Sequence, residues 1–190
     1  MKTKILLICG SSRAGSVNAA VLNTVQHISP PEVEARSFQG MTSLPHFNPD
    51  DDAHPLSHHV IDLRKAIRES DGILFCTPEY AGGLPGSFKN LLDWTVGGTE
   101  INMKAVGWIN AASLASPAGG EDAHASLRKV LGYLGASIVE AACPRLPIRR
   151  QEIGPDGLIN EPKIQLQIVA TITALAEAAT AMRIALQISE

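Results

Sequence analysis

The feature that most constrains this chain is the alternation of short apolar runs with longer amphipathic segments. Residues 4–9 form an apolar run that stops at Gly10, and residues 72–76 form a second run of the same kind. Uninterrupted runs of this length are typical of strands that are buried on both faces of a parallel sheet. The sequence predicts five strands, at residues 4–9, 33–38, 72–76, 105–112 and 137–142.

Amphipathic segments separate the expected strands. In the last of them, apolar residues recur at steps of three and four, the spacing of a helix with one buried face. The predicted helices lie at residues 17–28, 58–69, 85–95, 121–134 and 162–187. Strands that alternate with helices specify an α/β fold with a parallel sheet. With no linker, internal repeat or low-complexity block, residues 1–190 are expected to form a single domain.

Composition excludes several classes of protein. A net charge of −3 gives no basic footprint for nucleic acid, and 45% hydrophobic residues exclude a disordered chain. The apolar run before Gly10 is too short for a secretory signal, and the uncharged run at residues 164–176 is shorter than a membrane span. Cys9 and Cys76 lie inside apolar runs and are interpreted as small buried hydrophobes. We therefore expect a soluble cytoplasmic protein with no nucleic-acid or membrane partner.

Three loops rich in glycine, serine and proline follow predicted strands. They span residues 10–16, 77–86 and 113–120. In open parallel sheets, ligands bind outside the carboxyl ends of the strands, at the point where the strand order reverses. The sequence therefore predicts a ligand site that these three loops form together.

The first loop, in the segment GSSRAGSVN, joins a strand to a helix. Backbone N–H groups and the helix dipole favour an anion there, and Ser11, Arg13 and Ser16 add donors. A Walker A loop would need lysine and a hydroxyl residue where Ser16 and Val17 stand, and Ser12 replaces the second glycine of a dinucleotide fingerprint. A terminal monophosphate therefore suits the loop. An ordinary serine-capped helix start explains the same residues equally well.

The second and third loops are suited to a flat ligand. In the second loop, glycine turns beside prolines allow close backbone approach, and Pro78 and Tyr80 offer apolar surface. Glu79 is expected to brace the loop by accepting backbone N–H bonds, or else to be a solvated turn carboxylate. The third loop, residues 113–120, supplies small residues and amides that can approach a ring edge, or is simply a flexible connection.

Two segments carry a family resemblance, GSSRAGSVN and PEYAGGLPGSFKNLLDW. Together they resemble the NADPH-dependent FMN reductase family of flavodoxin-like proteins, which includes bacterial quinone, chromate and azo-dye reductases. Both motifs are matched at every specified position and in the family's order. The resemblance implies a flavodoxin-like, doubly wound, five-stranded parallel sheet of strand order 2-1-3-4-5 with helices on both faces. Residues 1–190 would then be one FMN-binding domain.

The resemblance also implies which residues bind the cofactor. Phosphate contacts fall to residues of the first loop, and Arg13 could also serve the phosphates of NADPH. The third loop departs from the family, whose members often carry a glycine soon after the fourth strand. The implied FMN-binding residues are Ser11, Arg13, Ser16, Val17, Asn18, Pro78, Glu79, Tyr80, Ala81, Gly82, Ser113, Gly119 and Gly120.

The activity implied by the resemblance is FMN-dependent NAD(P)H oxidoreduction. A ping-pong cycle would pass hydride from NADPH or NADH to FMN and then electrons to a quinone, azo compound, metal oxyanion or free flavin. No catalytic side chain is expected, because the flavin carries the chemistry. The resemblance implies a homodimer or homotetramer. The alternative is a noncatalytic flavin-binding electron carrier or redox sensor.

Other observations bear on rival functions. Residues 46–59 are rich in histidine and aspartate, but their spacing fits no familiar ligand pattern, so a solvated loop is favoured and no metal is expected. No GxSxG elbow marks a serine hydrolase. Aromatic residues make up only 4% of the chain, and Tyr80 alone falls in a predicted ligand loop. The regions around Phe38–Phe47 and Trp94–Trp108 either expose apolar surface for subunit contact or cover the sheet edges.

Overall fold

Five parallel strands form one sheet at the centre of the molecule, in the order β2-β1-β3-β4-β5. The computed structural model describes residues 2–113 and 118–188. The strands are β1 (Thr3–Cys9), β2 (Val33–Ser37), β3 (Gly72–Cys76), β4 (Ala105–Trp108) and β5 (Ser137–Ile138). The predicted α/β class and the implied strand order are both confirmed.

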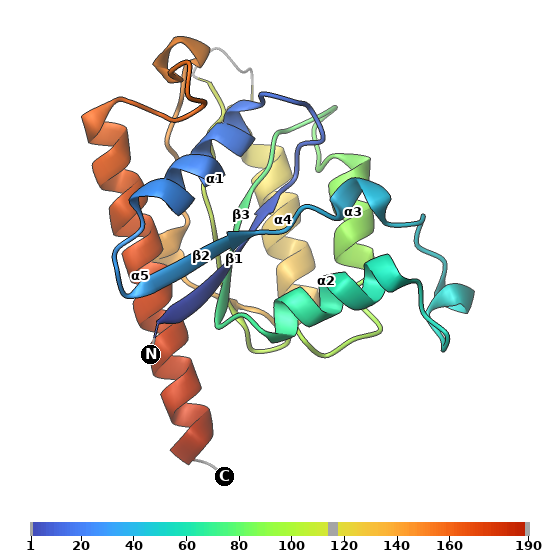
Figure 1. Cartoon of the computed structure of the whole chain (residues 1–190). Helices are drawn as coiled ribbons and strands as arrows, with labels where there is room; N and C mark the ends of the chain where they lie inside the picture. The colour runs from blue at the N-terminus through green and yellow to red at the C-terminus, as the bar shows by residue number, and fades with distance from the viewer. Residues whose placement is uncertain (1, 114–117, 189–190) are drawn as a thin grey trace.

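Helices cover both faces of this sheet (Figure 1). The buried residues of α1 and α5 belong to one core, and those of α2, α3 and α4 belong to the other. The fold is therefore doubly wound, as the resemblance implied. The helices are α1 (Val17–Ile28), α2 (His58–Arg68), α3 (Gly86–Asp93), α4 (Glu121–Tyr133) and α5 (Pro162–Ile188).

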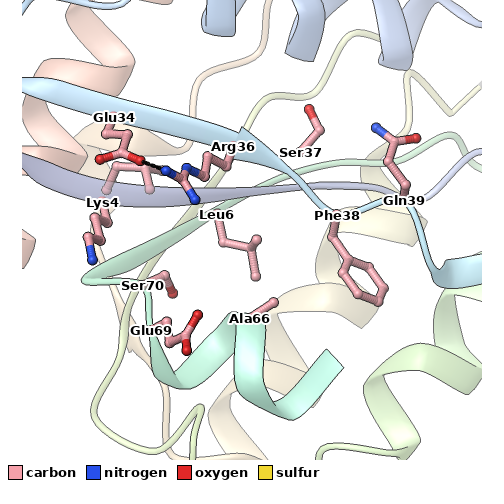
Figure 2. A pocket seen from close by; sticks show the side chains of 11 residues that line it. Lys4, Leu6, Glu34, Arg36, Ser37, Phe38, Gln39, Ala66, Glu69 and Ser70 are labelled. Atoms are coloured by element: carbon pink, nitrogen blue, oxygen red, sulfur yellow. Dashed lines mark ion pairs between the residues drawn. The ribbon is translucent and has the colours of Figure 1, made fainter. Parts of the chain in front are cut away.

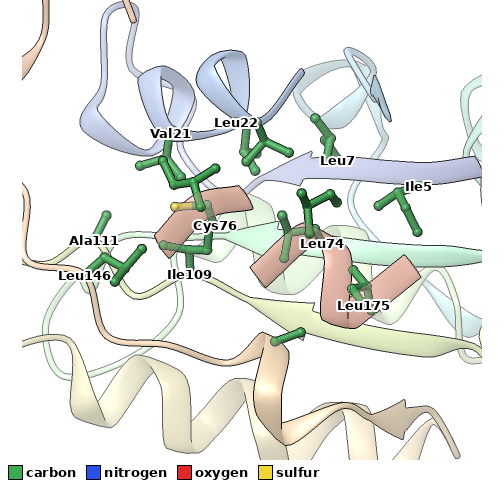
Figure 3. Close-up of a cluster of buried hydrophobic side chains, with 14 of the residues drawn as sticks. Ile5, Leu7, Val21, Leu22, Leu74, Cys76, Ile109, Ala111, Leu146 and Leu175 are labelled. Carbon is green, nitrogen blue, oxygen red and sulfur yellow. The ribbon is translucent and has the colours of Figure 1, made fainter. Parts of the chain in front are cut away.

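Alternation along the strands builds the two cores. Ile5 and Leu7 of β1 point toward α1 and α5, whereas Leu6 and Ile8 point to the opposite face. Figure 3 shows the first core, in which Leu74 meets side chains from α1 and α5. The continuous apolar run of β1 is explained by this arrangement, because every second residue would otherwise face water.

The ends of β4 and β5 differ from the predictions. β4 ends at Trp108 rather than at residue 112, and β5 has two residues rather than the six predicted at 137–142. Residues 140–142 turn into a short 3₁₀ helix instead. Beyond it, the chain returns to β4: the N–H of Asn110 donates to Pro144 O at 2.9 Å, and the N–H of Leu146 donates to Asn110 O at 2.8 Å. Residues 144–146 thus take the place that a longer β5 would have occupied.

The two tryptophans are core residues. Trp94 is 1% exposed and Trp108 is 4% exposed. The ring of Trp94 makes an edge contact with Phe47 at a centroid distance of 5.1 Å. Both indoles therefore cover the sheet, whereas Val96 and Met103 of the same region are 61% and 62% exposed, so the expectation of apolar surface for subunit contact there stays a prediction.

α5 is long and apolar enough, by length and composition alone, to cross a membrane over Pro162–Leu186. Its residues Ile168, Ile172 and Leu175 are fully buried against the sheet. A core helix meets the same criterion of length and hydropathy, so this single helix is only a weak indication of a membrane span.

Candidate functional site

The strand order reverses between β1 and β3, and the first two predicted loops begin there. The chain leaves β1 toward α1 on one face of the sheet and leaves β3 toward α3 on the other. Cys9 and Cys76 are register partners at the ends of these strands, so the loops start side by side. This is the position at which parallel α/β sheets bind ligands.

Gly10 allows the two loops to approach each other. Its N–H donates to Cys76 O at 2.9 Å. A Cβ at this position would lie 2.3 Å from Thr77 Oγ1 and 2.6 Å from Thr77 Cβ, which no packed structure tolerates without a shift. The glycine at the end of the first strand is therefore required by the contact between the loops.

The first loop ends at a capped helix. Ser16 is the N-cap of α1, and its Oγ accepts a hydrogen bond from Ala19 N at 3.0 Å. Asn18 is buried, and its Oδ1 accepts a bond from Cys76 Sγ at 3.2 Å. The serine-capped helix start is thus present. It does not exclude a ligand, because the Asn18 amide N–H groups are left to donate.

Unpaired donors remain around this helix start. Among residues 2–113 and 118–188, the backbone N–H groups of residues 14–18 have no acceptor. The side chain of Arg13 is exposed, and its guanidinium makes no ion pair with any other described residue. The Arg13 backbone N–H donates to Ser11 Oγ at 3.3 Å, which leaves the Ser11 hydroxyl proton free. Free donors, one cation and a helix N-terminus together favour an anion with several oxygens.

The second loop carries a tight turn at its tip. The N–H of Tyr80 donates to Gly83 O at 3.0 Å, and the N–H of Gly83 donates to Tyr80 O at 3.1 Å. Ala81 and Gly82 have φ angles of 50° and 71°, so both central residues are left-handed, as in a type I′ turn. Tyr80 is 54% exposed beside this turn. The tip therefore presents backbone and one aromatic ring to the outside.

Glu79 joins the second loop to α4. Its Oε2 accepts a hydrogen bond from Ala123 N at 3.1 Å, in the first turn of that helix. The prediction that Glu79 accepts backbone N–H bonds is confirmed, although the donor belongs to α4 rather than to the loop itself. The carboxylate caps the helix and fixes the distance between the second loop and α4.

The third loop is described only at its two ends. Ser113 is half-buried, and Gly119 and Gly120 are buried with φ angles of 56° and 77°. Residues 114–117, which the sequence analysis included in this loop, lie outside the described residues. Asn110 Nδ2 donates to Gly119 O at 3.0 Å, and Asn110 Oδ1 accepts from Ala112 N at 3.0 Å. Asn110 therefore holds the glycine turn against the end of β4.

Sequence reasoning missed Asn110 and His124. His124 lies in the first turn of α4, and its Nδ1 is 2.6 Å from Gly120 O. Burial lowers the pKa of His124 below its usual value. Asn110 is a single polar residue within an apolar segment, whereas His124 stands among acidic and small residues at a helix start, and neither setting says which contact the side chain makes.

A cavity of about 300 Å³ lies elsewhere, between the β1–β2 edge of the sheet and α2 (Figure 2). Leu6, Phe38 and Ala66 line its apolar part, and an ion pair between Arg36 and Glu34 crosses one side. None of its lining residues belongs to the three loops. It is therefore separate from the site at the switch point.

An ion pair anchors the segment at residues 46–59 to α2. Arg64 Nη2 donates to Asp52 Oδ1 at 2.7 Å and to Oδ2 at 2.9 Å, and Arg64 Nε donates to Trp94 O at 3.1 Å. Both charged side chains are about nine-tenths buried. Within the part of the chain that the structure describes, no group of three or more His, Cys, Asp or Glu residues is arranged to hold a metal ion.

The fold is that of a flavodoxin-like α/β protein, and hydrogen-bond donors with no acceptor among the described residues gather at its β1/β3 switch point. A model of the NADPH-dependent FMN reductase family matches residues 3–146. The chain belongs to this family, and it is an oxidoreductase of the NAD(P)H-dependent FMN reductase and quinone reductase type, with FMN as its flavin.

Individual relatives agree with this assignment. The chain is 28% identical over 141 residues to a quinone reductase of Escherichia coli, covering 73% of this chain and 74% of the relative. It is 26% identical over 181 residues to an NAD(P)H:quinone oxidoreductase of Solanum tuberosum, covering 90% of each protein. In structure it is similar to the flavoenzyme FerB of Paracoccus denitrificans, with a TM-score of 0.82, 23% identity, and coverage of 95% of this chain and 98% of that one.

Proposed function

We propose that FMN binds across the three loops, with its phosphate at the start of α1 and its ring between the second and third loops. The observation that carries this proposal is the set of unpaired N–H groups of residues 14–18 beside Arg13, at the switch point. The proposed cofactor-binding residues are Ser11, Arg13, Ser16, Val17, Asn18, Pro78, Glu79, Tyr80, Ala81, Gly82, Ser113, Gly119 and Gly120.

The described residues fit a phosphate in charge and in donor count. The helix N-terminus and the Arg13 guanidinium supply positive potential, and the free N–H groups supply directed hydrogen bonds. The hydroxyl proton of Ser11 remains available, because its oxygen already accepts a backbone bond. Asn18 directs its amide N–H groups away from Cys76, since Oδ1 is the atom that receives the thiol.

The ring would meet small residues and backbone groups. When bound, FMN supplies the two-electron chemistry, by taking hydride from NAD(P)H and passing electrons to an acceptor. Tyr80 is the aromatic residue among the proposed contacts, and it is half exposed at a turn tip. A ring face that no aromatic side chain covers can receive the nicotinamide and the acceptor in turn. We therefore propose a ping-pong cycle, with no side chain acting as a general acid or base.

The acceptors that we propose are quinones, azo compounds, metal oxyanions and free flavin. The second candidate function is a flavin-binding electron carrier, which the same phosphate loop would serve. Anaerobic titration of the yellow protein with NADPH separates the two. An oxidoreductase loses its flavin colour promptly and recovers it when a quinone is added, with parallel double-reciprocal plots for the two substrates. Slow or absent bleaching would instead favour the carrier.

We further propose a homodimer or homotetramer in the cytoplasm. The support is the resemblance to the family, together with the exposed apolar side chains Val96 and Met103 in the Trp94–Trp108 region. Light scattering coupled to size-exclusion chromatography tests the oligomeric state. A mass near that of one chain, 20.2 kDa, would contradict it.

A further inference from the structure

His124 is a buried titratable residue to which the proposed function assigns no role. It belongs to the first turn of α4 and is 7% exposed. Directly before this helix lie Gly119 and Gly120, the described glycines of the third loop. Ala123, the residue before His124, donates its N–H to Glu79 from the second loop. His124 thus stands where two of the proposed flavin-binding loops meet one helix.

The contact at Nδ1 fixes where the ring can exchange a proton. Nδ1 lies 2.6 Å from Gly120 O, and a carbonyl oxygen only accepts hydrogen bonds. Nδ1 therefore keeps its proton in both protonation states, and only Nε2 gains or loses one. Nε2 is buried and has no hydrogen-bond partner among the described residues. Because no described group bonds to Nε2, no hydrogen bond has to break when this atom gains or loses a proton, and the charges around the ring decide its state.

A neighbouring charge and burial shift the pKa of His124 in opposite directions. Glu79 favours the protonated imidazole, whereas burial disfavours it and is the larger effect, so the pKa of His124 is lowered. One turn along α4, the Arg128 guanidinium lies 5.0 Å from the centroid of the Trp108 ring and is paired with Glu140. The charged side chains on the elements packed around His124 are Glu79 from the second loop, Glu121, Asp122 and Arg128 from α4, and Arg145 against Gly119.

We propose that His124 is a proton-linked positioning residue of the flavin site. Through Nδ1 it holds the Gly119–Gly120 turn in place. At Nε2 it takes up a proton when negative charge is added to the site beside Glu79 and Gly120. The inference rests on the proposed function, because the added charge is that of FMN after reduction. His124 acts through the turn and through the local charge, and no contact between it and the flavin is required.

The test compares the wild type with two variants that separate these roles. His124→Asn keeps an N–H donor at the position of Nδ1 but cannot titrate, whereas His124→Leu loses both the donor and the proton. The FMN-loaded proteins are reduced with dithionite, and the midpoint potential is followed from about pH 5 to about pH 8. The slope of the potential against pH gives the number of protons taken up per two electrons.

The wild type should take up two protons per two electrons over part of this range, one by the flavin and the other at Nε2. His124→Asn should take up one proton throughout and bind FMN as tightly as the wild type. His124→Leu should bind FMN about three- to tenfold more weakly, because Gly120 O loses its side-chain donor and keeps only the backbone N–H of residue 124. Histidine-ring nitrogen NMR of the loaded wild type gives a second reading. The Nε2 signal should change on reduction, and the Nδ1 signal should remain that of a protonated nitrogen.

The outcomes are distinguishable. Equal slopes for the wild type and His124→Asn, with both proteins yellow, would overturn the role of His124 and leave FMN binding intact. An Nε2 signal that does not change when the wild type is reduced would also overturn the role of His124. This measurement needs no variant, so it decides the question even if both variants fail to fold. A wild-type protein that cannot be loaded with FMN would overturn the proposed function and this inference together.

Discussion

Replacement of Arg13 by alanine tests the phosphate loop directly. The side chain is exposed and has no ion-pair partner among the described residues, so its loss should leave the stability of the FMN-free protein unchanged. A hydrogen bond to a charged group contributes about 1.5–3 kcal/mol, and solvent exposure places Arg13 at the lower end. About 1.5 kcal/mol corresponds to a roughly tenfold increase in the Kd of FMN.

Quenching of flavin fluorescence by the FMN-free protein measures this Kd, and riboflavin serves as the internal control. Riboflavin lacks the phosphate, so the wild type and Arg13→Ala should bind it equally well. The salt dependence of FMN binding should also be less steep in the variant, since one phosphate contact is lost. Arg36→Ala is the matched control, because Arg36 is exposed, pairs with Glu34 on the edge strand and lies outside the three loops.

Two results would refute the assignment of Arg13. One is an unchanged Kd for FMN in Arg13→Ala at low ionic strength. The other is an equal loss of affinity for FMN and riboflavin, which would place Arg13 at the ring or the ribityl chain instead. Weakening of FMN binding in Arg36→Ala would show that net charge, rather than a phosphate contact, sets the affinity.

Four further changes have definite expected outcomes. Gly10→Ala should lower the unfolding free energy by about 1–3 kcal/mol in urea, because its Cβ meets the facing threonine. Glu79→Ala should cost about 1 kcal/mol in the same assay through loss of the α4 cap, and Glu79→Gln should cost less. Arg64→Met leaves the Asp52 carboxylate buried and unpaired, at about 3 kcal/mol, so Tm should fall by roughly 6–12 °C in calorimetry. Finally, the pKa of His124 is lowered in the folded protein. Below about pH 6.5 the unfolded chain therefore binds more protons than the folded chain does. The FMN-free wild type should lose stability in that window relative to His124→Asn, and parallel pH profiles would contradict the burial of a neutral imidazole.

The sequence predicted the elements that position the site because their signals are local. β3 and α1 have the predicted bounds, and β1 begins one residue earlier than predicted. Both of these strands are apolar runs bounded by a glycine or a polar residue. The ends of β4 and β5 were mispredicted because pairing there depends on residues 144–146, which return from elsewhere in the chain. No periodicity within an isolated segment could have shown that return.

The sequence could not predict the role of a residue where that role depends on one contact with a residue distant in the chain. Glu79 was assigned the right kind of bond but not the right donor, since Ala123 is far away in the sequence. Asn110 and His124 were missed because neither the apolar segment around Asn110 nor the polar helix start around His124 identifies the partner of the side chain. For the region around Trp94 the sequence left two possibilities open, exposed apolar surface or cover for the sheet edge, because the burial of this indole depends on Phe47, a residue distant in the chain.

The reversal of strand order also couples cofactor supply to the lifetime of the protein. A ligand that spans the first two loops ties α1, on one side of the sheet, to α3 on the other, so it stabilises both hydrophobic cores at once. A ligand that binds only the folded state at a hundred times its Kd adds about 2.7 kcal/mol to stability. Chains made when flavin is scarce would unfold more often and be removed by proteases sooner. The abundance of this reductase should therefore follow the flavin status of the cell.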